Sequence, residues 1–323
     1  MIKKMINPDY SLDEITSRFF NYLSGKIGSF EVVDIIEQMS GGWEAYLYKF
    51  RVSGVEGYEG PLVLRLFPKY SHPETAEWQD MLHNLLRAEG VPVPKVYFSV
   101  SDVSVLGGSF LVMDFMEGDA IDPGDDPSVL VLTAETQALL HQKDGRGISE
   151  EIRARGHSHG SHTFDGRIKW LLDRSQKYPE LHEFVQWLVN NRPPEPENPV
   201  ILHGDFHPMN LLVKDGKVNA ILDWSGFMVG DPMYDLGWTK ALFIATAKHE
   251  VPPDLFHQLI GSYIDTYESV SPIDYEKLEY FVVYRLVRAL FEGRDGQEIW
   301  TRRDIVDNIL NELAEMTGIR VQI

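Results

Sequence analysis

Residues 200–210 read VILHGDFHPMN, and we expect the whole fold to be organised around them. The apolar run at the start of this stretch predicts a short strand that delivers Asp205 to a loop. Asn210 follows five residues later, and a second apolar run begins immediately after it. The stretch therefore predicts a loop that carries a carboxylate and a carboxamide between two strands.

The segment after this loop predicts a hairpin. Its turn is Asp215-Gly216, a pair that tolerates the positive φ required by a two-residue hairpin turn. The return strand ends at Asp223. The hairpin would bring Asp205, Asn210 and Asp223 together at one end of a small ribbon. One general base and two oxygen ligands for a hard cation are what phosphoryl transfer from Mg-ATP requires.

This pattern resembles the catalytic loop and the metal-binding aspartate of the aminoglycoside phosphotransferase family, which includes choline-, homoserine- and macrolide-kinase-like enzymes. The shared elements are His-Gly-Asp-x4-Asn at residues 203–210 and Ile-Leu-Asp at residues 221–223. The resemblance implies a protein-kinase-like fold, with Asp205 as the catalytic base and Asn210 and Asp223 as magnesium ligands. It also implies ATP and Mg²⁺ as cofactors, and a hydroxyl group of a small molecule as the phosphoryl acceptor.

The two histidines of the loop leave an alternative open. His203, Asp205 and His207 could be zinc or iron ligands in a metal-dependent hydrolase. That interpretation leaves Asn210 and the strand before Asp223 unexplained. We expect His203 instead to brace the loop through hydrogen bonds to the backbone or to Asp223. His207 either does the same or faces the phosphates.

Length and composition bound the class of protein. At 323 residues the chain exceeds one ordinary core and predicts two lobes. A hydrophobic content of 43%, with 11% aromatic residues, is sufficient for globular packing, so we do not expect widespread disorder. There is no apolar run of membrane-spanning length, no signal-peptide core at the start, and no cysteine. These features predict a cytoplasmic location.

The charge balance is strongly acidic. Thirty basic residues against 49 acidic ones give a formal net charge of −19. Such a surface repels nucleic acid and anionic membrane, so we expect neither as a partner. It would also attract a cationic acceptor such as an aminoglycoside or a choline. An acidic surface that is unrelated to the substrate is the simpler explanation.

Residues 1–115 predict an N-terminal nucleotide-binding lobe built on a small antiparallel sheet of five strands. Two predicted strands flank Ser40-Gly41-Gly42, an arrangement that lets backbone amides approach phosphates. The resemblance assigns these three residues to the nucleotide phosphates. It likewise assigns the backbone of Asp114 and Met116, which follow a predicted buried strand, to the edge of the adenine.

The family carries a basic residue on the next strand, where it pairs the α- and β-phosphates. Many relatives have lysine there, whereas this chain has Arg65, a competent bidentate partner for phosphate; Lys69 is the second candidate. A carboxylate on the following helix pairs this residue in the family. Glu77 fits the spacing best, and Glu74 and Asp80 are alternatives. The arginine and the abbreviated glycine loop permit a second alternative, a catalytically weak nucleotide-binding protein.

Residues 116–323 predict a larger, mainly helical C-terminal lobe that holds the catalytic and acceptor-binding residues, so the predicted fold class is α+β and two-lobed. The glycine-rich stretch 143–163 contains His157, His159 and His162, and we expect a loop there rather than a metal site. Helices are predicted over residues 126–142, 167–176, 181–190, 254–270, 273–291 and 302–317.

A further family-like segment lies at residues 230–236, GDPMYDL. In the family its acidic residues buttress the catalytic loop, which predicts a structural role for Asp235 and a structural or substrate-side role for Asp231. Tyr234 and Trp238 could form an aromatic wall that binds a cation. The alternative is that both pack as ordinary helix core.

Overall fold

The computed structural model describes residues 10–39, 45–157, 163–248 and 250–321. The predicted phosphate-binding residues Ser40, Gly41 and Gly42 lie outside these ranges, as do His159 and His162.

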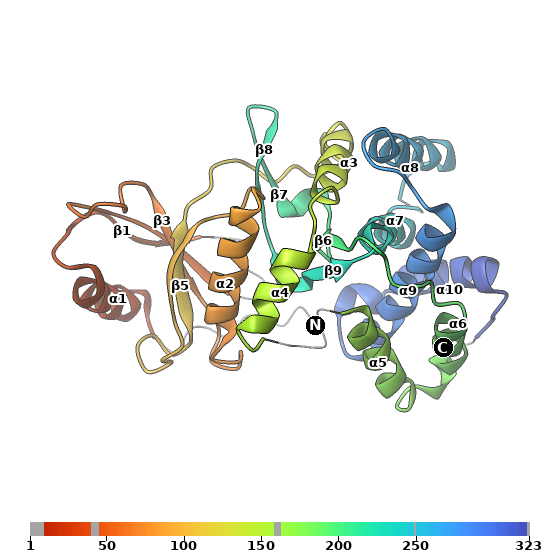
Figure 1. The fold of residues 1–323 in the computed structure, drawn as a ribbon, viewed down its shortest axis with the longest axis horizontal. Helices are drawn as coiled ribbons and strands as arrows, with labels where there is room; N and C mark the ends of the chain where they lie inside the picture. The colour runs from red at the N-terminus through yellow and green to blue at the C-terminus, as the bar shows by residue number, and fades with distance from the viewer. Residues whose placement is uncertain (1–9, 40–44, 158–162, 249, 322–323) are drawn as a thin grey trace. The chain divides into compact units, whose positions relative to one another are not determined.

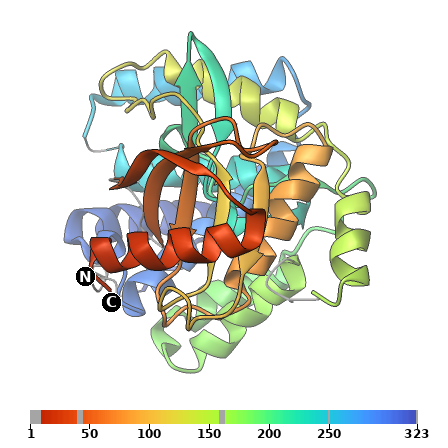
Figure 2. The same ribbon diagram turned by 90° about the vertical axis from the view of Figure 1, so that its left-hand side faces the viewer.

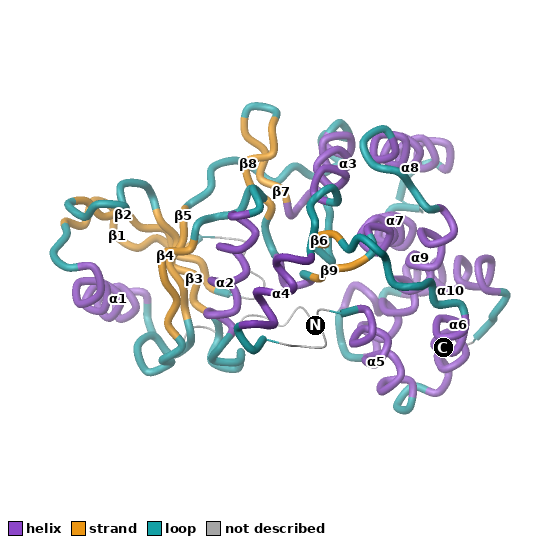
Figure 3. Tube along the Cα trace, viewed as in Figure 1, coloured by secondary structure: helices purple, strands orange, loops and turns teal. Residues whose placement is uncertain are grey.

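The chain forms two compact units. The first runs to Gly118 and also includes Asn219–Ile221, while the second comprises Asp119–Val218 and the chain from Leu222 onward. The first unit contains the large sheet, and the second is mainly helical (Figure 3). The predicted α+β fold class is confirmed.

The first unit is built on the larger sheet (Figure 1). As predicted, this sheet is antiparallel and has five strands, in the order β1-β2-β3-β5-β4. The strands are β1 (Glu31–Gln38), β2 (Tyr46–Ser53), β3 (Leu62–Leu66), β4 (Val96–Val100) and β5 (Phe110–Asp114).

Side chains alternate along the central strands, which gives the sheet two apolar faces. The even-numbered leucines of β3 pack on the side of α1 (Leu12–Ile27), whereas Val63 packs on the side of α2 (Thr75–Ala88). A capping box at Ser11 fixes the start of α1, which lies across its face of the sheet (Figure 2). Because the period is two, Arg65 shares the face of Val63, on the side of α2.

The second unit is organised around helix α9, whose residues are buried along most of its length. Within the described residues, none of the helices combines the length and the apolar character that a membrane span needs. The helices of this unit are α3 (Val129–Leu140), α4 (Arg146–Ala154), α5 (Phe164–Ser175), α6 (His182–Asn190), α7 (Pro232–Thr246), α8 (Pro253–Glu268), α9 (Tyr275–Arg294) and α10 (Arg303–Thr317).

Helix α4 shows that the prediction of a loop over residues 143–163 was wrong. Ile148 and Ile152 stand four residues apart and are both buried, so the segment has a short apolar face. The prediction of a loop was based on the glycines of this stretch. Gly145 precedes the helix, where a Cβ would lie 2.4 Å from the side chain of Val229, so close packing explains this glycine.

Two further sheets of two strands each flank the predicted loop. Strand β6 (Val200–Leu202) pairs with β9 (Met228–Gly230), and β7 (Leu211–Lys214) pairs with β8 (Lys217–Ile221). The turn residues Asp215-Gly216 have φ values of 51° and 71°, which confirms the predicted hairpin turn.

Candidate active site

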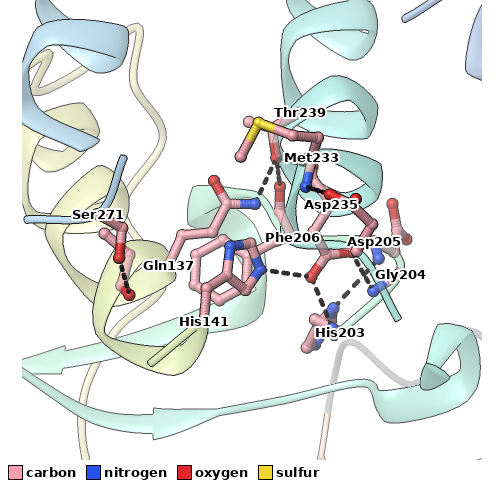
Figure 4. A network of polar contacts seen from close by, with 12 residues as sticks. Gln137, His141, His203, Gly204, Asp205, Phe206, Met233, Asp235, Thr239 and Ser271 are labelled. Carbon is pink, nitrogen blue, oxygen red and sulfur yellow. Dashed lines mark hydrogen bonds and ion pairs between the residues drawn. The ribbon is translucent and has the colours of Figure 1, made fainter. Parts of the chain in front are cut away.

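Asp235 of α7 fixes the start of the loop. Its two carboxylate oxygens each accept a backbone N–H bond of 2.6 Å, one from His203 and the other from Gly204. Nε2 of His141 lies 3.3 Å from the same carboxylate, and Figure 4 shows these groups converging on it. Asp235 is fully buried, so these bonds replace the water that it would bind in solution. The predicted buttressing role of Asp235 is therefore confirmed.

A second brace lies one helical turn further along α7. The hydroxyl of Thr239 donates to the carbonyl of Phe206 at 2.7 Å (Figure 4). The amide of Gln137 donates to the same hydroxyl at 3.1 Å, and Tyr263 donates to Gln137 at 2.9 Å. This buried chain of hydrogen bonds fixes the loop on the far side of Asp205.

The backbone of the loop requires glycine at residue 204. Gly204 has a φ of 82°, and a Cβ there would lie 2.0 Å from the carbonyl oxygen of Gly226. Gly226 belongs to the 3-10 turn Trp224–Gly226 that directly follows Asp223. The start of the loop and the segment after Asp223 are thus in backbone contact.

His203 ties the loop to the strand that precedes Asp223. Its buried ring donates from Nε2 to the carbonyl of Leu222 at 2.7 Å, and its Nδ1 accepts the N–H of Asp205 at 3.3 Å. The backbone is therefore the partner of His203. Because both ring nitrogens are engaged, neither is left to bind a metal ion. In the part of the chain that the structure describes, no three His, Cys, Asp or Glu side chains are grouped to hold a metal ion. The hydrolase alternative thus has no supporting site there.

One carboxylate oxygen of Asp205 accepts a hydrogen bond, and the side chain is partly exposed. The indole N–H of Trp238 donates to its Oδ1 at 2.9 Å. Nε2 of His207 lies 3.8 Å from Oδ2, and 38% of the Asp205 side chain is exposed. Trp238 therefore restricts rotation of the carboxylate while Oδ2 stays accessible to a proton donor.

Two hydrogen bonds set the orientation of Asn210. Its Nδ2 donates to the carbonyl of Asp205 at 2.9 Å and to Nε2 of His207 at 3.1 Å. Its Oδ1 accepts no hydrogen bond from any described residue. The amide oxygen of Asn210 is consequently free to serve as a ligand of a hard cation.

His207 is neutral in this arrangement. Because its Nε2 accepts a hydrogen bond from Asn210, its ring proton is on Nδ1. The pKa of His207 is lowered, mainly because the ring is buried. The negative charges of Asp205 and Asp223 oppose this shift, and the neighbouring His203 adds to it. The 3.8 Å contact with Asp205 is thus not an ion pair. His207 thus contacts the side chain of Asn210, and its facing of the phosphates stays a prediction.

Asp223 follows β8 in a left-handed backbone conformation, with a φ of 56° and a ψ of 70°. Such a conformation is uncommon for a residue other than glycine and is often found at functional sites. The N–H of Leu222 donates to the carbonyl of Asn210 at 2.8 Å, which places Asp223 next to the loop. Asp223 Oδ1 accepts the N–H of Ser225 at 3.4 Å. The structure therefore brings Asp205, Asn210 and Asp223 together.

In the first unit, the candidates on β3 and α2 differ in how their side chains are used. The carboxylate of Asp80 accepts hydrogen bonds of 2.7 and 2.8 Å from two side chains of its own unit. Glu77 is exposed on α2, and Glu74 is exposed immediately before that helix. Lys69 is exposed in the segment after β3. Since Asp80 is already bound, Glu77 stays the candidate partner of Arg65.

The predicted adenine-binding residues lie at the end of β5. The N–H of Asp114 donates to the carbonyl of Lys95 at 3.0 Å, and its side chain accepts the hydroxyl of Tyr97 at 2.7 Å. An adenine contact from Asp114 would therefore have to come from its carbonyl group. Met116 is half-buried two residues further on.

Sequence reasoning missed the hydrogen bond from Trp238 to Asp205 and the contact between His141 and Asp235. The first had a signal, because Asp231, Asp235 and Trp238 are spaced to share one face of a helix. His141 had none, since it lies on a distant segment at the end of α3. Tyr234 is 1% exposed and lies in the core, as one of its two predicted roles required.

Several known proteins resemble this chain in sequence. A sequence profile of the phosphotransferase enzyme family matches residues 35–273. Acyl-CoA dehydrogenase family member 11 of Gallus gallus is 32% identical over 168 residues, which cover 49% of this chain and 22% of that protein. Aminoglycoside 3'-phosphotransferase of Enterococcus faecalis is 30% identical over 115 residues, 35% of this chain and 38% of that protein. The chain spans 20–28% of the length of the acyl-CoA dehydrogenase relatives that it matches.

Solved structures share the fold at low sequence identity. A crystal structure of a putative aminoglycoside phosphotransferase from Ralstonia eutropha has a TM-score of 0.63 at 21% identity, covering 93% of this chain and 95% of that one. A thermostable mutant of an aminoglycoside phosphotransferase, in complex with AMP-PNP and hygromycin B, has a TM-score of 0.61 at 18% identity. The match covers 93% of this chain and 99% of that one. Macrolide 2'-phosphotransferase from Brachybacterium faecium has a TM-score of 0.58 at 17% identity, and the match covers 94% of this chain and 99% of that one.

Proposed function

Because the chain belongs to the phosphotransferase enzyme family, as its catalytic-loop motif predicted, we propose that it transfers the γ-phosphoryl group of ATP to a hydroxyl group of a small molecule. The observation that carries this proposal is the convergence of Asp205, Asn210 and Asp223 around His207. The similar structure that contains AMP-PNP supports an adenine nucleotide as the donor.

Asp205 is the catalytic base in this proposal. Its Oδ2 accepts a hydrogen bond from the acceptor hydroxyl and takes the proton as the hydroxyl oxygen attacks the γ-phosphorus. Trp238 holds Oδ1, so the carboxylate does not have to reorient before the attack. Most of the rate acceleration in such a site comes from positioning and from neutralised charge.

Asn210 and Asp223 fit a magnesium ion. Mg²⁺ prefers oxygen ligands and is commonly held by one or two protein side chains, with substrate phosphates and water completing the shell. Asn210 Oδ1 and Asp223 Oδ2 accept no hydrogen bond from the described part of the chain. When bound, the ion neutralises charge on the phosphates.

The first unit supplies the remaining nucleotide contacts in this proposal. Backbone groups of Ser40-Gly41-Gly42 are assigned to the phosphates. Arg65 binds the phosphates, and Glu77 forms an ion pair with Arg65. The carbonyl of Asp114 and the N–H of Met116 bind the edge of the adenine.

A kinase assay tests the function. Purified protein with Mg-ATP is incubated with a panel of hydroxyl compounds that includes cationic acceptors such as aminoglycosides and choline, and ADP formation is measured beside ATP-induced thermal stabilisation. Turnover of any panel member supports the proposal. Stabilisation without turnover favours the catalytically weak nucleotide-binding protein that Arg65 permits, and the absence of both contradicts both functions.

Replacing Asp223 with asparagine tests the metal site. The variant keeps a side-chain oxygen and tolerates the left-handed backbone but loses one ligand charge, so we expect about 10-fold weaker activation by Mg²⁺. The matched control is Asp215→Asn, because Asp215 also has a positive φ, of 51°, but lies in the hairpin turn. Equal Mg²⁺ titrations of the two variants would remove Asp223 from the metal site.

Replacing Trp238 with phenylalanine tests the orientation of the base. Phenylalanine retains an aromatic ring in the core but cannot donate to Asp205, so we expect kcat to fall about 10-fold, the equivalent of one lost hydrogen bond to a charged group. The KM for ATP should not change. Steady-state ADP formation measures both constants, and an unaltered kcat would show that the carboxylate needs no such brace.

A further inference from the structure

Two arginines of α9 lie against the ring of Trp238 and share one carboxylate. The guanidinium of Arg285, a residue that is 5% exposed, lies 3.9 Å from the centre of this ring, and that of Arg288 lies 5.0 Å from it. Glu292 accepts from Arg285 at 3.1 Å and from Arg288 at 2.7 Å. A single buried carboxylate thus pairs with two arginines, of which Arg285 is buried and Arg288 is partly buried.

Arg167 of α5 adds a third positive charge. Its Nη2 donates to the carbonyl of Gly226 at 3.0 Å, and no carboxylate of the described residues pairs with it. Burial raises the pKa of the Tyr234 hydroxyl and Tyr284 raises it further, whereas the charges of Arg167 and Arg288 lower it. The ring of Phe164, three residues before Arg167 on α5, lies 6.0 Å from the ring of Tyr234, so α5 and Tyr234 are neighbours.

Buried polar atoms in this neighbourhood lack hydrogen-bond partners. Within the described residues, no hydrogen-bond partner is present for Nε of Arg167 or for Nε of Arg285. The rings of Tyr234 and Tyr284 are 5.5 Å apart, and Tyr234 lies 5.9 Å from Trp238. Native proteins leave few such atoms unpaired, and a missing ligand is one physical reason for a group of them.

The local charge is opposite in sign to that of the whole chain. Arg167, Arg285 and Arg288 against Glu292 leave a surplus of two positive charges, in a chain whose formal net charge is −19. Burying unpaired charge is unfavourable unless a partner compensates for it. Access is not closed, because 18% of the Arg288 side chain is exposed. Trp238 connects this arginine cluster to the catalytic base.

We propose that the acceptor substrate carries an anionic group, a carboxylate or a phosphate, which Arg167 and Arg288 bind while its hydroxyl lies at Asp205. This inference rests on the proposed function and names the charge class of its acceptor. The acidic surface does not oppose it, because exposed charges are screened over about 10 Å, whereas buried pairs are screened much less. Arg285, stacked on Trp238 and paired with Glu292, has a structural role.

Thermal unfolding with added inorganic phosphate tests the anion site without nucleotide, magnesium or turnover. The test variant is Arg167→Gln, which removes the guanidinium charge and keeps a polar amide. The matched control is Lys169→Gln, which removes the same charge from an exposed position on the same helix. We expect phosphate to raise the Tm of the wild type and of the control, and to shift the test variant by less than half as much. No shift in the wild type, or equal shifts in the two variants, would overturn the proposal.

A matched acceptor series tests the substrate class. Its members are ω-hydroxyalkyl compounds of equal chain length that end in a carboxylate, a phosphate, a methyl group or a trimethylammonium group, and ADP formation is measured with Mg-ATP. We expect the carboxylate or the phosphate members to be preferred at least 10-fold in kcat/KM, and Arg167→Gln to remove that preference without changing the KM for ATP. Preference for trimethylammonium would overturn the inference and leave the proposed function standing. If no member reacts and ATP gives no stabilisation, the proposed function fails, while the phosphate titration still decides the anion site.

Discussion

Replacing Asp205 with asparagine is expected to lower kcat by at least about 100-fold, because the variant loses the group that accepts the proton of the acceptor hydroxyl. The substitution keeps the size of the side chain, and the amide oxygen can still accept the indole N–H of Trp238. Nucleotide binding should survive, since the carboxylate of Asp205 is not assigned to the nucleotide or the metal ion. The measurement is single-turnover ADP formation beside thermal stabilisation by Mg-AMP-PNP.

The control for this variant is Asp173→Asn, which removes one exposed carboxylate from α5. It should retain full activity. If Asp205→Asn turned over as fast as this control, Asp205 would not be the base. If it instead lost stabilisation by Mg-AMP-PNP, its carboxylate would act on the nucleotide and not on the acceptor.

The parts of the fold that the sequence predicted well are those set by residues close together in the chain. The turn at Asp215-Gly216 depends on the φ preference of two neighbours. The loop from His203 to Asn210 is similarly local, and its internal hydrogen bonds span at most five residues. Such features are accessible to pattern reasoning because these interactions join residues that are close together in the chain.

The parts that the sequence did not predict depend on partners that are distant in the chain. Helix α4 was predicted as a loop because glycine alone cannot distinguish a turn from close packing against Val229. The bond between Trp238 and Asp205 joins residues 33 positions apart, and the bond between Asp235 and the backbone of His203 joins residues 32 apart. A sequence shows which of these groups are polar, but only the fold shows that they meet.

Asp235 links helix α7 to the loop and so sets the position of the proposed base, Asp205. It holds two successive N–H groups of the loop, and Asp205 is the next residue after them. Replacing Asp235 with alanine leaves both N–H groups buried without an acceptor. At about 1–3 kcal/mol for each unsatisfied group, we expect the free energy of unfolding of the helical unit to fall by about 3 kcal/mol or more. The measurement is urea denaturation, with kcat determined below the unfolding transition.

Two variants separate this effect from a general loss of charge. Asp235→Asn retains one acceptor oxygen for two donors, so its stability should lie between those of the wild type and the alanine variant. Asp265→Ala removes an exposed carboxylate from α8 and should change the free energy of unfolding by no more than about 0.5 kcal/mol. If Asp235→Ala were no less stable than Asp265→Ala, the loop would hold its conformation without the carboxylate of Asp235. The placement of Asp205 would then have to come from Trp238, Thr239 and His203.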